Sequence, residues 1–121
     1  MGTTMTSTEF KCLRESMGLT TKWLAERWDV SEFSVQRWER NRTLPAELEL
    51  DIRGLKERFD REVARVADAG GDCVLVPRND RLRTAGAMPA AWHRMVAQRA
   101  SEKAGLRILF EDDEQEPADG R

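Results

Sequence analysis

Apolar side chains recur every three or four positions through the first part of the chain, which is the spacing of amphipathic helices. The first stripe predicts a helix over about 7–17 and consists of Phe10, Leu13 and Met17. Thr6, with Glu9 three residues later, is typical of a capped helix start, and Gly18 stands where a left-handed C-cap is expected. The chain is therefore expected to open with a short, capped helix.

Two more short helices are expected, joined by a tight connection. The second helix starts at Thr20 or Thr21 and ends near Trp28, with an apolar face on one side. A three-residue connection ends in Ser31, which is suited to cap a third helix over about 32–40. Within that third helix, two inward-facing side chains three positions apart are expected, namely Val35 and Trp38.

A long fourth helix should follow. Asn41 tolerates the left-handed conformation expected at the end of the third helix, and Pro45 is well placed to open a helix that runs to about Ala69. Its continuous apolar stripe consists of Leu48, Ile52, Leu55, Phe59, Val63 and Val66. This stripe is longer than three short helices can cover, so its second half needs the C-terminal region or a second subunit as a partner.

The pattern changes after the Gly-Gly pair that follows the fourth helix. The apolar, β-branched run 73–76 predicts a strand, and the arginine-containing segment 78–88 predicts a loop. A helix over about 90–104 and a second strand over 106–110 complete the pattern. Two strands make too small a sheet to stand alone, so this segment should pair with a copy of itself or lie on the fourth helix.

Composition excludes several functional classes. No run approaches the ~20 apolar residues that span a bilayer, and the first residues lack the features of a signal peptide, so we expect a cytoplasmic protein. Cys12 and Cys73 have no metal-ligand spacing, and His93 is the one histidine, which leaves no catalytic triad and no histidine-based metal site. We therefore expect no enzyme activity, no cofactor, no metal and no small-molecule substrate.

The order of the first three helices is the layout of a helix-turn-helix, in which the third helix enters the major groove of DNA. The sequence of 10–45, FKCLRESMGLTTKWLAERWDVSEFSVQRWERNRTLP, resembles the Cro/C1, or XRE, helix-turn-helix family. The matching segments are LRESMGLTTKWLA, the turn DVS and the ending VQRWERNR. The chain departs from that family at Asp29 and Asn41, where glycine is usual, and at Phe33, where a polar base reader is usual.

The remainder of the chain narrows the resemblance. The long proline-initiated helix and a β-α-β end containing AAWHRMVAQRAS look like anti-CRISPR-associated autorepressors and the related YdiL-like proteins. That resemblance implies a homodimer formed by the C-terminal part, and an Arg14–Glu39 pair within the fold. The dimerisation candidates are Val74, Val76, Trp92, Val96, Leu106, Ile108 and Phe110.

The expected fold is mainly α. An N-terminal Cro/C1-type helix-turn-helix bundle with a long fourth helix should occupy 1–69, followed by a small β-α-β dimerisation segment over 70–110. Residues 111–121 hold six acids against one arginine and are expected to form a solvated, disordered tail. Residues 1–110 then carry 19 basic against 16 acidic residues, a balance of +3 that the overall −2 conceals.

The outward face of the third helix supplies the candidates for DNA recognition. An arginine can donate two hydrogen bonds to guanine, a glutamine can pair with adenine, and a phenylalanine can touch a thymine methyl. The base-reading candidates are Glu32, Phe33, Gln36 and Arg37, of which Arg37 is the strongest. The phosphate-contacting candidates are Thr21, Lys22, Ser31, Arg40 and Arg42.

These residues predict a homodimeric repressor that binds double-stranded DNA at a palindromic operator and acts on its own operon. The alternative is an antitoxin-like module whose C-terminal segment binds and neutralises another protein. A toxin-sized reading frame beside the gene would favour the antitoxin, whereas a protected palindrome upstream of the gene would favour the repressor.

Overall fold

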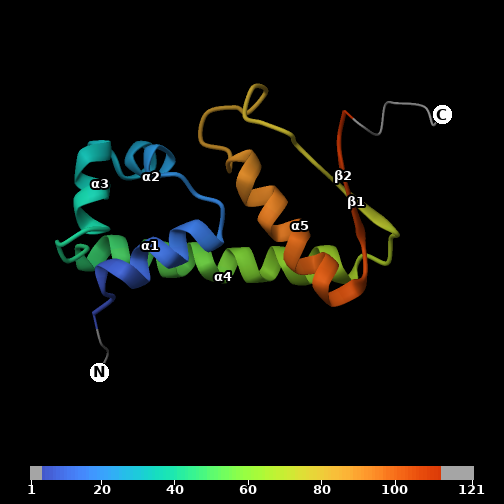
Figure 1. The fold of residues 1–121 in the computed structure, drawn as a ribbon, viewed down its shortest axis with the longest axis horizontal. Helices are drawn as coiled ribbons and strands as arrows, with labels where there is room; N and C mark the ends of the chain where they lie inside the picture. Colours follow the sequence, from blue (N-terminus) through green and yellow to red (C-terminus); the bar gives the residue numbers. More distant parts are fainter. Residues whose placement is uncertain (1–3, 113–121) are drawn as a thin grey trace.

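The structure is a computed structural model that describes residues 4–112 of the chain. It is mainly helical, with one long helix and a small two-stranded parallel sheet beside the last helix (Figure 1). The elements in order are α1 (Ser7–Ser16), α2 (Thr21–Trp28), α3 (Glu32–Trp38), α4 (Ala46–Asp68), β1 (Cys73–Val76), α5 (Ala90–Ala104) and β2 (Arg107–Phe110). The predicted elements are confirmed, with ends that agree to within two residues. Most of the predicted tail, 113–121, lies outside the described residues.

Side-chain caps define the starts of the first three helices. The Thr6 hydroxyl accepts from the Glu9 amide at 3.0 Å while the Glu9 carboxylate accepts from the Thr6 amide at 2.9 Å, so the predicted capping box is present. Thr20 caps α2 through the Trp23 amide at 2.9 Å, and Ser31 caps α3 through the Ser34 amide at 3.1 Å. Local sequence therefore sets where these short helices begin.

The backbone after α3 differs from the expectation, and a left-handed residue follows α2 instead. Asn41 does not adopt the left-handed conformation; the non-glycine residue with positive φ among the described residues is Asp29, with φ 55°. The chain leaves α3 instead through a turn in which the Arg37 carbonyl accepts from the amides of Arg40, Asn41 and Arg42 at 3.0 to 3.1 Å. Asp29 thus takes the conformation that glycine would supply, which aspartate tolerates better than most residues.

The second half of α4 packs against α5, so the C-terminal region supplies the partner that its apolar stripe requires. The Phe59 and Trp92 rings meet edge to face with centroids 5.1 Å apart. The Trp92 indole N–H donates to Glu62 Oε1 at 2.8 Å, and Arg58 Nε donates to Glu62 Oε2 at 2.9 Å. Burial of Glu62 raises the pKa of this carboxyl, but the hydrogen bonds from Trp92 and Arg58, together with the positive charges of Arg58 and Arg65, leave the pKa lowered.

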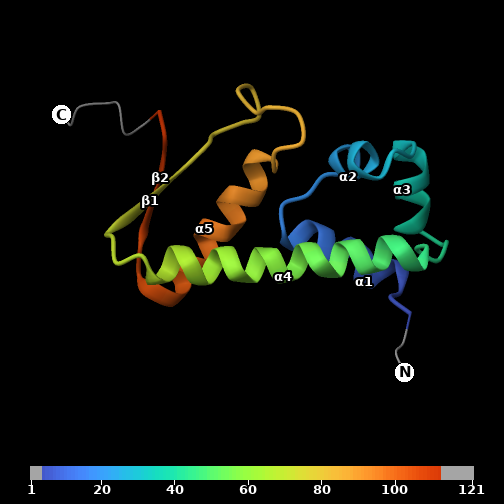
Figure 2. The same ribbon diagram turned by 180° about the vertical axis from the view of Figure 1, so that it is seen from behind.

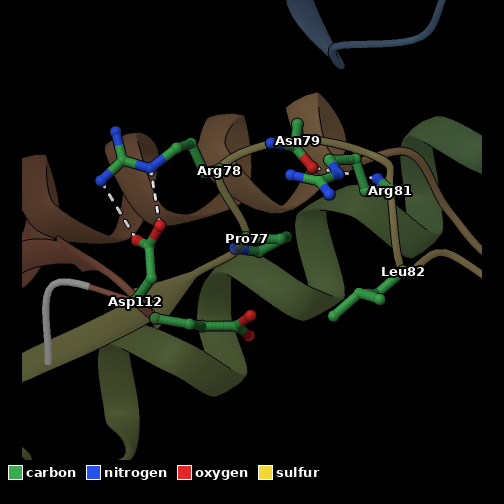
Figure 3. A pocket seen from close by; sticks show the side chains of 7 residues that line it. Pro77, Arg78, Asn79, Arg81, Leu82 and Asp112 are labelled. Carbon is green, nitrogen blue, oxygen red and sulfur yellow. Dashed lines mark hydrogen bonds and ion pairs between the residues drawn. The ribbon is translucent and has the colours of Figure 1, made fainter. Parts of the chain in front are cut away.

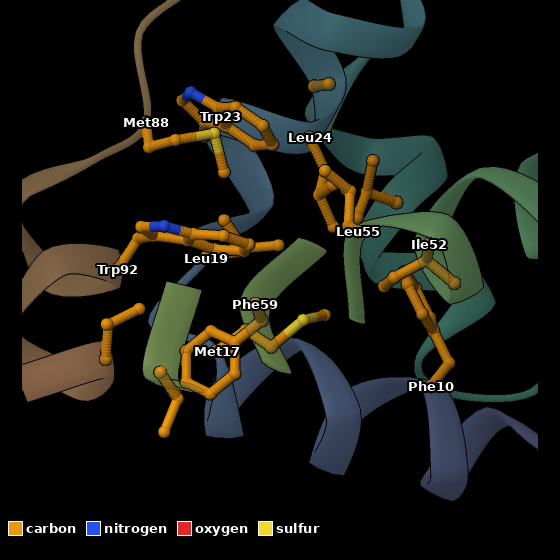
Figure 4. Packing of buried hydrophobic residues seen from close by; sticks show 14 of the residues in the cluster. Phe10, Met17, Leu19, Trp23, Leu24, Ile52, Leu55, Phe59, Met88 and Trp92 are labelled. Carbon is orange, nitrogen blue, oxygen red and sulfur yellow. The ribbon is translucent and has the colours of Figure 1, made fainter. Parts of the chain in front are cut away.

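One hydrophobic core runs through both predicted segments. The buried cluster extends from Phe10 in α1 to Trp92 and Leu106 near the C-terminus, and both Phe10 and Trp92 are fully buried. Figure 4 shows Met88, from the loop before α5, lying beside Trp23 of α2. Residue 69 therefore marks the end of α4, and the hydrophobic core continues past it into the C-terminal segment.

The first three helices and the sheet lie towards opposite ends of α4. Figures 1 and 2 show α3 beside the N-terminal end of α4 and the β1–β2 sheet beside its C-terminal end. In the sheet, Leu75 is in register with Leu109 and Val76 with Phe110. Val76 is buried, whereas Leu75 is 43% exposed, so the sheet has one face on the core and one towards solvent.

Gly18, in the turn between α1 and α2, lies against the start of α5. Its φ is +72°, and a Cβ placed there would lie 2.4 Å from the Ala91 carbonyl oxygen. Two constraints therefore select glycine at this position: a left-handed backbone and the close approach of another main chain. Gly70 has a similar φ of +81°, but a Cβ placed on it would have no contact within 4 Å.

We predict that Gly18→Ala destabilises the protein more than Gly70→Ala. Both substitutions incur the cost of a left-handed alanine, about 1–2 kcal/mol. Gly18→Ala adds the clash with Ala91, which should cost a further ~1–3 kcal/mol because main-chain atoms must move. Urea unfolding of both variants measures the difference, and equal losses would contradict the close approach of α5 to this turn.

Candidate nucleic-acid interface

A paired arginine and glutamate tie α1 to the end of α3. Arg14 Nε donates to Glu39 Oε2, Arg14 Nη2 donates to Glu39 Oε1 at 3.2 Å, and Arg14 Nη1 donates to the Leu19 carbonyl at 2.7 Å. The two side chains are only 12% and 9% exposed. This confirms the expected Arg14–Glu39 pair, and both residues serve the fold.

Asp51 of α4 holds the C-terminal end of α2. Arg27 donates to both of its carboxylate oxygens, at 2.7 and 2.9 Å, and the Trp28 indole N–H donates to it at 2.7 Å. The pKa of Asp51 is lowered, chiefly by the hydrogen bonds from Arg27, against an opposing effect of burial and with a further contribution from Trp28. Nothing in the sequence pattern pointed to Asp51, because its partners lie 23 and 24 positions away.

Aromatic side chains fill the space between α1, α2 and α3. The Trp28 ring stacks on Phe10 with centroids 6.1 Å apart and meets Trp38 edge-on at 6.3 Å. Trp23 points elsewhere: its indole N–H donates to the Ala87 carbonyl at 2.9 Å. Trp23 therefore fastens the loop before α5 to α2.

The outward face of α3 stays free of packing. Glu32, Phe33 and Gln36 are exposed, Arg37 is half-buried, and Val35 on the opposite face is fully buried. Phe33 is 59% exposed, and the Arg37 guanidinium carbon lies 5.5 Å from the centroid of its ring. The structure thus brings the four base-reading candidates together on one short helix at one end of the molecule (Figure 1).

Two of the phosphate candidates already have partners. The Thr21 hydroxyl donates to Glu32 Oε2 at 2.6 Å, which joins the N-terminal ends of α2 and α3. The Ser31 hydroxyl caps α3 and lies 3.0 Å from the Ser34 hydroxyl. Both hydroxyls would have to share or exchange these hydrogen bonds to contact a phosphate.

The three cationic candidates are available. Lys22, Arg40 and Arg42 are exposed, and within residues 4–112 their side chains make no hydrogen bond or ion pair. They flank the outward face of α3, one at the start of α2 and two after α3. Their placement gives the α3 end of the molecule exposed positive charges that suit a polyanion.

The dimerisation candidates divide into two groups. Four are buried within the single chain: Val76, Trp92, Val96 and Leu106. They form core in one protomer and offer no surface to a second copy in this conformation. The other three, Val74, Ile108 and Phe110, are half-buried in the sheet. They lie on the same face of the sheet as the buried Val76, because alternate residues of a strand share a face.

A cavity of about 490 Å³ lies far from α3, between the segment after β1 and the residues after β2 (Figure 3). Arg78 pairs with Asp112 across it at 2.9 and 3.1 Å, and Leu82 at its rim is 95% exposed. None of its lining residues is buried. Such an open cavity has no enclosed polar group to orient a small molecule.

Two further properties concern the described residues alone. They contain no group of three or more histidine, cysteine or acidic side chains placed to hold a metal ion. None of their helices combines the length and the apolarity needed to cross a membrane.

Comparison with known proteins finds no family model that matches the sequence and no curated protein that is significantly similar to it.

The acid dependence of folding should depend on Asp51. Because its pKa is lowered in the folded protein, Asp51 stabilises the fold above its ordinary pKa of 3.8, and this stabilisation is lost as pH falls through the lower folded value. We predict that Asp51→Asn loses less stability between about pH 5 and pH 2 than the wild type.

Trp28→Phe, which removes one donor and leaves Arg27 in place, should give an intermediate dependence on pH. Urea unfolding at a series of pH values measures all three proteins. A wild-type slope in Asp51→Asn would show that the Arg27–Asp51 bond does not hold α2 in solution.

Proposed function

We propose that this protein is a homodimeric, sequence-specific DNA-binding repressor that reads an inverted-repeat operator and acts on its own operon. The observation that carries the proposal is the outward face of α3. A seven-residue helix that is held by Arg14–Glu39, by its Ser31 cap and by a tryptophan cluster nevertheless leaves its polar face and a phenylalanine in solvent. A rigid helix with an uncovered face suits insertion into the major groove, which is wide enough to admit one helix.

The pairing of α2 and α3 supports the same proposal. They are joined by a three-residue turn, in which the Val30 amide donates to the Ala25 carbonyl at 3.0 Å. This is the helix-turn-helix arrangement, in which the second helix of the pair reads bases and the first lies across the DNA backbone. Lys22 at the start of α2 and Arg40 and Arg42 after α3 would then contact phosphates on either side of the groove.

The sheet at the other end of α4 supports dimerisation. Leu75 and Leu109 are in-register neighbours on its outer face, and Leu75 is 43% exposed. A sheet of two strands is too small to be stable alone and leaves strand edges that a second sheet can extend. In a two-fold dimer of this kind the two copies of α3 would lie about 34–36 Å apart, one turn of DNA.

We predict that Arg37→Ala weakens binding to the cognate operator by about 5–150-fold for each half-site and has a much smaller effect on unrelated DNA. The reason is that a bidentate arginine–guanine contact is worth ~1–3 kcal/mol of discrimination. The operator is obtained by selecting duplexes from a random pool with the wild-type protein, and affinities are then measured by fluorescence anisotropy.

Arg42→Ala is the matched control for that experiment. As a phosphate contact it should weaken cognate and unrelated duplexes alike and reduce the slope of log K against log salt by about one unit for each protomer, or about two for the dimer. An equal loss on both kinds of DNA in Arg37→Ala would remove Arg37 from base reading.

We further predict that Leu75→Asp converts a dimer into a monomer of 13.9 kDa in light scattering. The substitution places a charge on the outer face of the sheet, where the wild-type side chain is exposed, so the protomer should keep its helical circular dichroism. Leu50→Asp, at a leucine of α4 that is 73% exposed, is the control and should stay dimeric. A dimer that survives Leu75→Asp would move the interface away from this face of the sheet.

A further inference from the structure

We propose that Phe33 and Arg37 act as one unit that reads a thymine next to a guanine. In this unit the Phe33 ring contacts the thymine methyl group and positions the Arg37 guanidinium for the guanine. The inference rests on the proposed function, because it specifies which bases the outward face of α3 recognises.

The first observation is the exposure of Phe33. It is 59% exposed on a helix whose other outward side chains are polar, and it lies outside the hydrophobic core cluster. A large apolar side chain in that position gains little from folding, since much of it stays in contact with water. A ligand with an apolar group in the major groove would cover it, and the methyl group of thymine is the apolar group that B-DNA presents there.

The second observation is the position of Arg37. It lies one helical turn after Phe33, and its guanidinium carbon is 5.5 Å from the ring centroid, which is within the range of a cation–π contact. Within the described residues the Arg37 side chain makes no hydrogen bond or ion pair, so its donors stay available while the ring restricts its conformations. Phe33 is therefore a positioning residue for the arginine as well as a contact surface.

The neighbouring acid does not neutralise this arginine. Glu32 is the acidic residue on the outward face of α3, and its carboxylate accepts from the Thr21 hydroxyl at 2.6 Å, on the side towards α2. The Arg37 charge is thus left for the DNA, where guanine offers two acceptors, O6 and N7, on its major-groove edge.

The spacing of the two side chains suits neighbouring base pairs. Four residues of helix rise by about 6 Å, which is between one and two base-pair steps of ~3.4 Å. Because the Arg37 guanidinium carbon lies only 5.5 Å from the Phe33 ring centroid, an arginine bound to one guanine leaves the ring within reach of the adjacent pair. A cytosine that carries a 5-methyl group presents the same apolar group in the same position, so the unit should also prefer 5-methylcytosine to cytosine beside the guanine.

The experiment uses the full chain and the selected operator. Each thymine adjacent to a guanine is replaced singly by deoxyuridine, which removes only the methyl group. For the wild type, each half-site should contain one thymine whose single replacement weakens binding about fourfold, which is the effect of losing the burial of one methyl-sized group. In Phe33→Ala the same replacement should have no effect. When this thymine is changed to cytosine or to 5-methylcytosine, the wild type should bind the 5-methylcytosine duplex more tightly than the cytosine duplex, whereas Phe33→Ala should bind both equally.

The positioning role has its own readout. Phe33→Ala should also reduce the preference for guanine over adenine at the adjacent pair, and Phe33→Tyr, which keeps the ring under the guanidinium, should restore it. Leu50→Ala, a change at an exposed apolar residue outside α3, is the control and should behave as the wild type.

Two results would overturn the inference. One is an operator with no thymine whose methyl group affects wild-type binding; the other is a methyl effect of equal size in Phe33→Ala. Both leave sequence-specific binding intact and so differ from failure of the proposed function, in which the selection yields no preferred sequence at all.

Discussion

The apolar stripe of α4 is the surface on which the rest of the fold is built. Its first half supports α1, α2 and α3, and its second half receives α5 through the edge-to-face contact of Phe59 and Trp92. The two halves are linked by the approach of the α1–α2 turn to the start of α5, which Gly18 permits. Because both ends share one core, packing along α4 sets the position of α3 relative to the sheet.

The α3 end of the molecule shows how a short helix can be held firmly and yet leave one face uncovered. The Arg14–Glu39 pair, the Asp51 contacts and the stacked aromatic rings all act on the inner side of α2 and α3. Fixing these elements in the free protein lowers the conformational entropy that binding must remove. The exposed side chains of Lys22, Arg40 and Arg42 have no such constraints. This agrees with the proposed contacts to DNA phosphates, for which geometry matters less than charge.

The sequence was informative where structure follows from local rules. Caps such as Thr6 and Ser31, and the stripe of α4, predicted the helices closely, because capping and periodicity depend on neighbouring residues. It was less informative where partners are distant in sequence: Asp51, the Gly18–Ala91 approach and the Trp23–Ala87 bond have no local signal. Trp92 was a dimerisation candidate for the same reason. Its apolar character indicated burial, but not whether the surface that buries it belongs to its own chain or to a second copy.

The central claim is that α3 reads a specific DNA sequence. The most direct measurement is a protection footprint of the purified protein on the DNA upstream of its own gene, with unrelated competitor DNA present. We expect protection of an inverted repeat whose half-sites are centred about 10–10.5 base pairs apart, or a multiple of that spacing. A uniform footprint that competitor DNA abolishes, or no protection at concentrations at which the protein is a dimer, would contradict this claim.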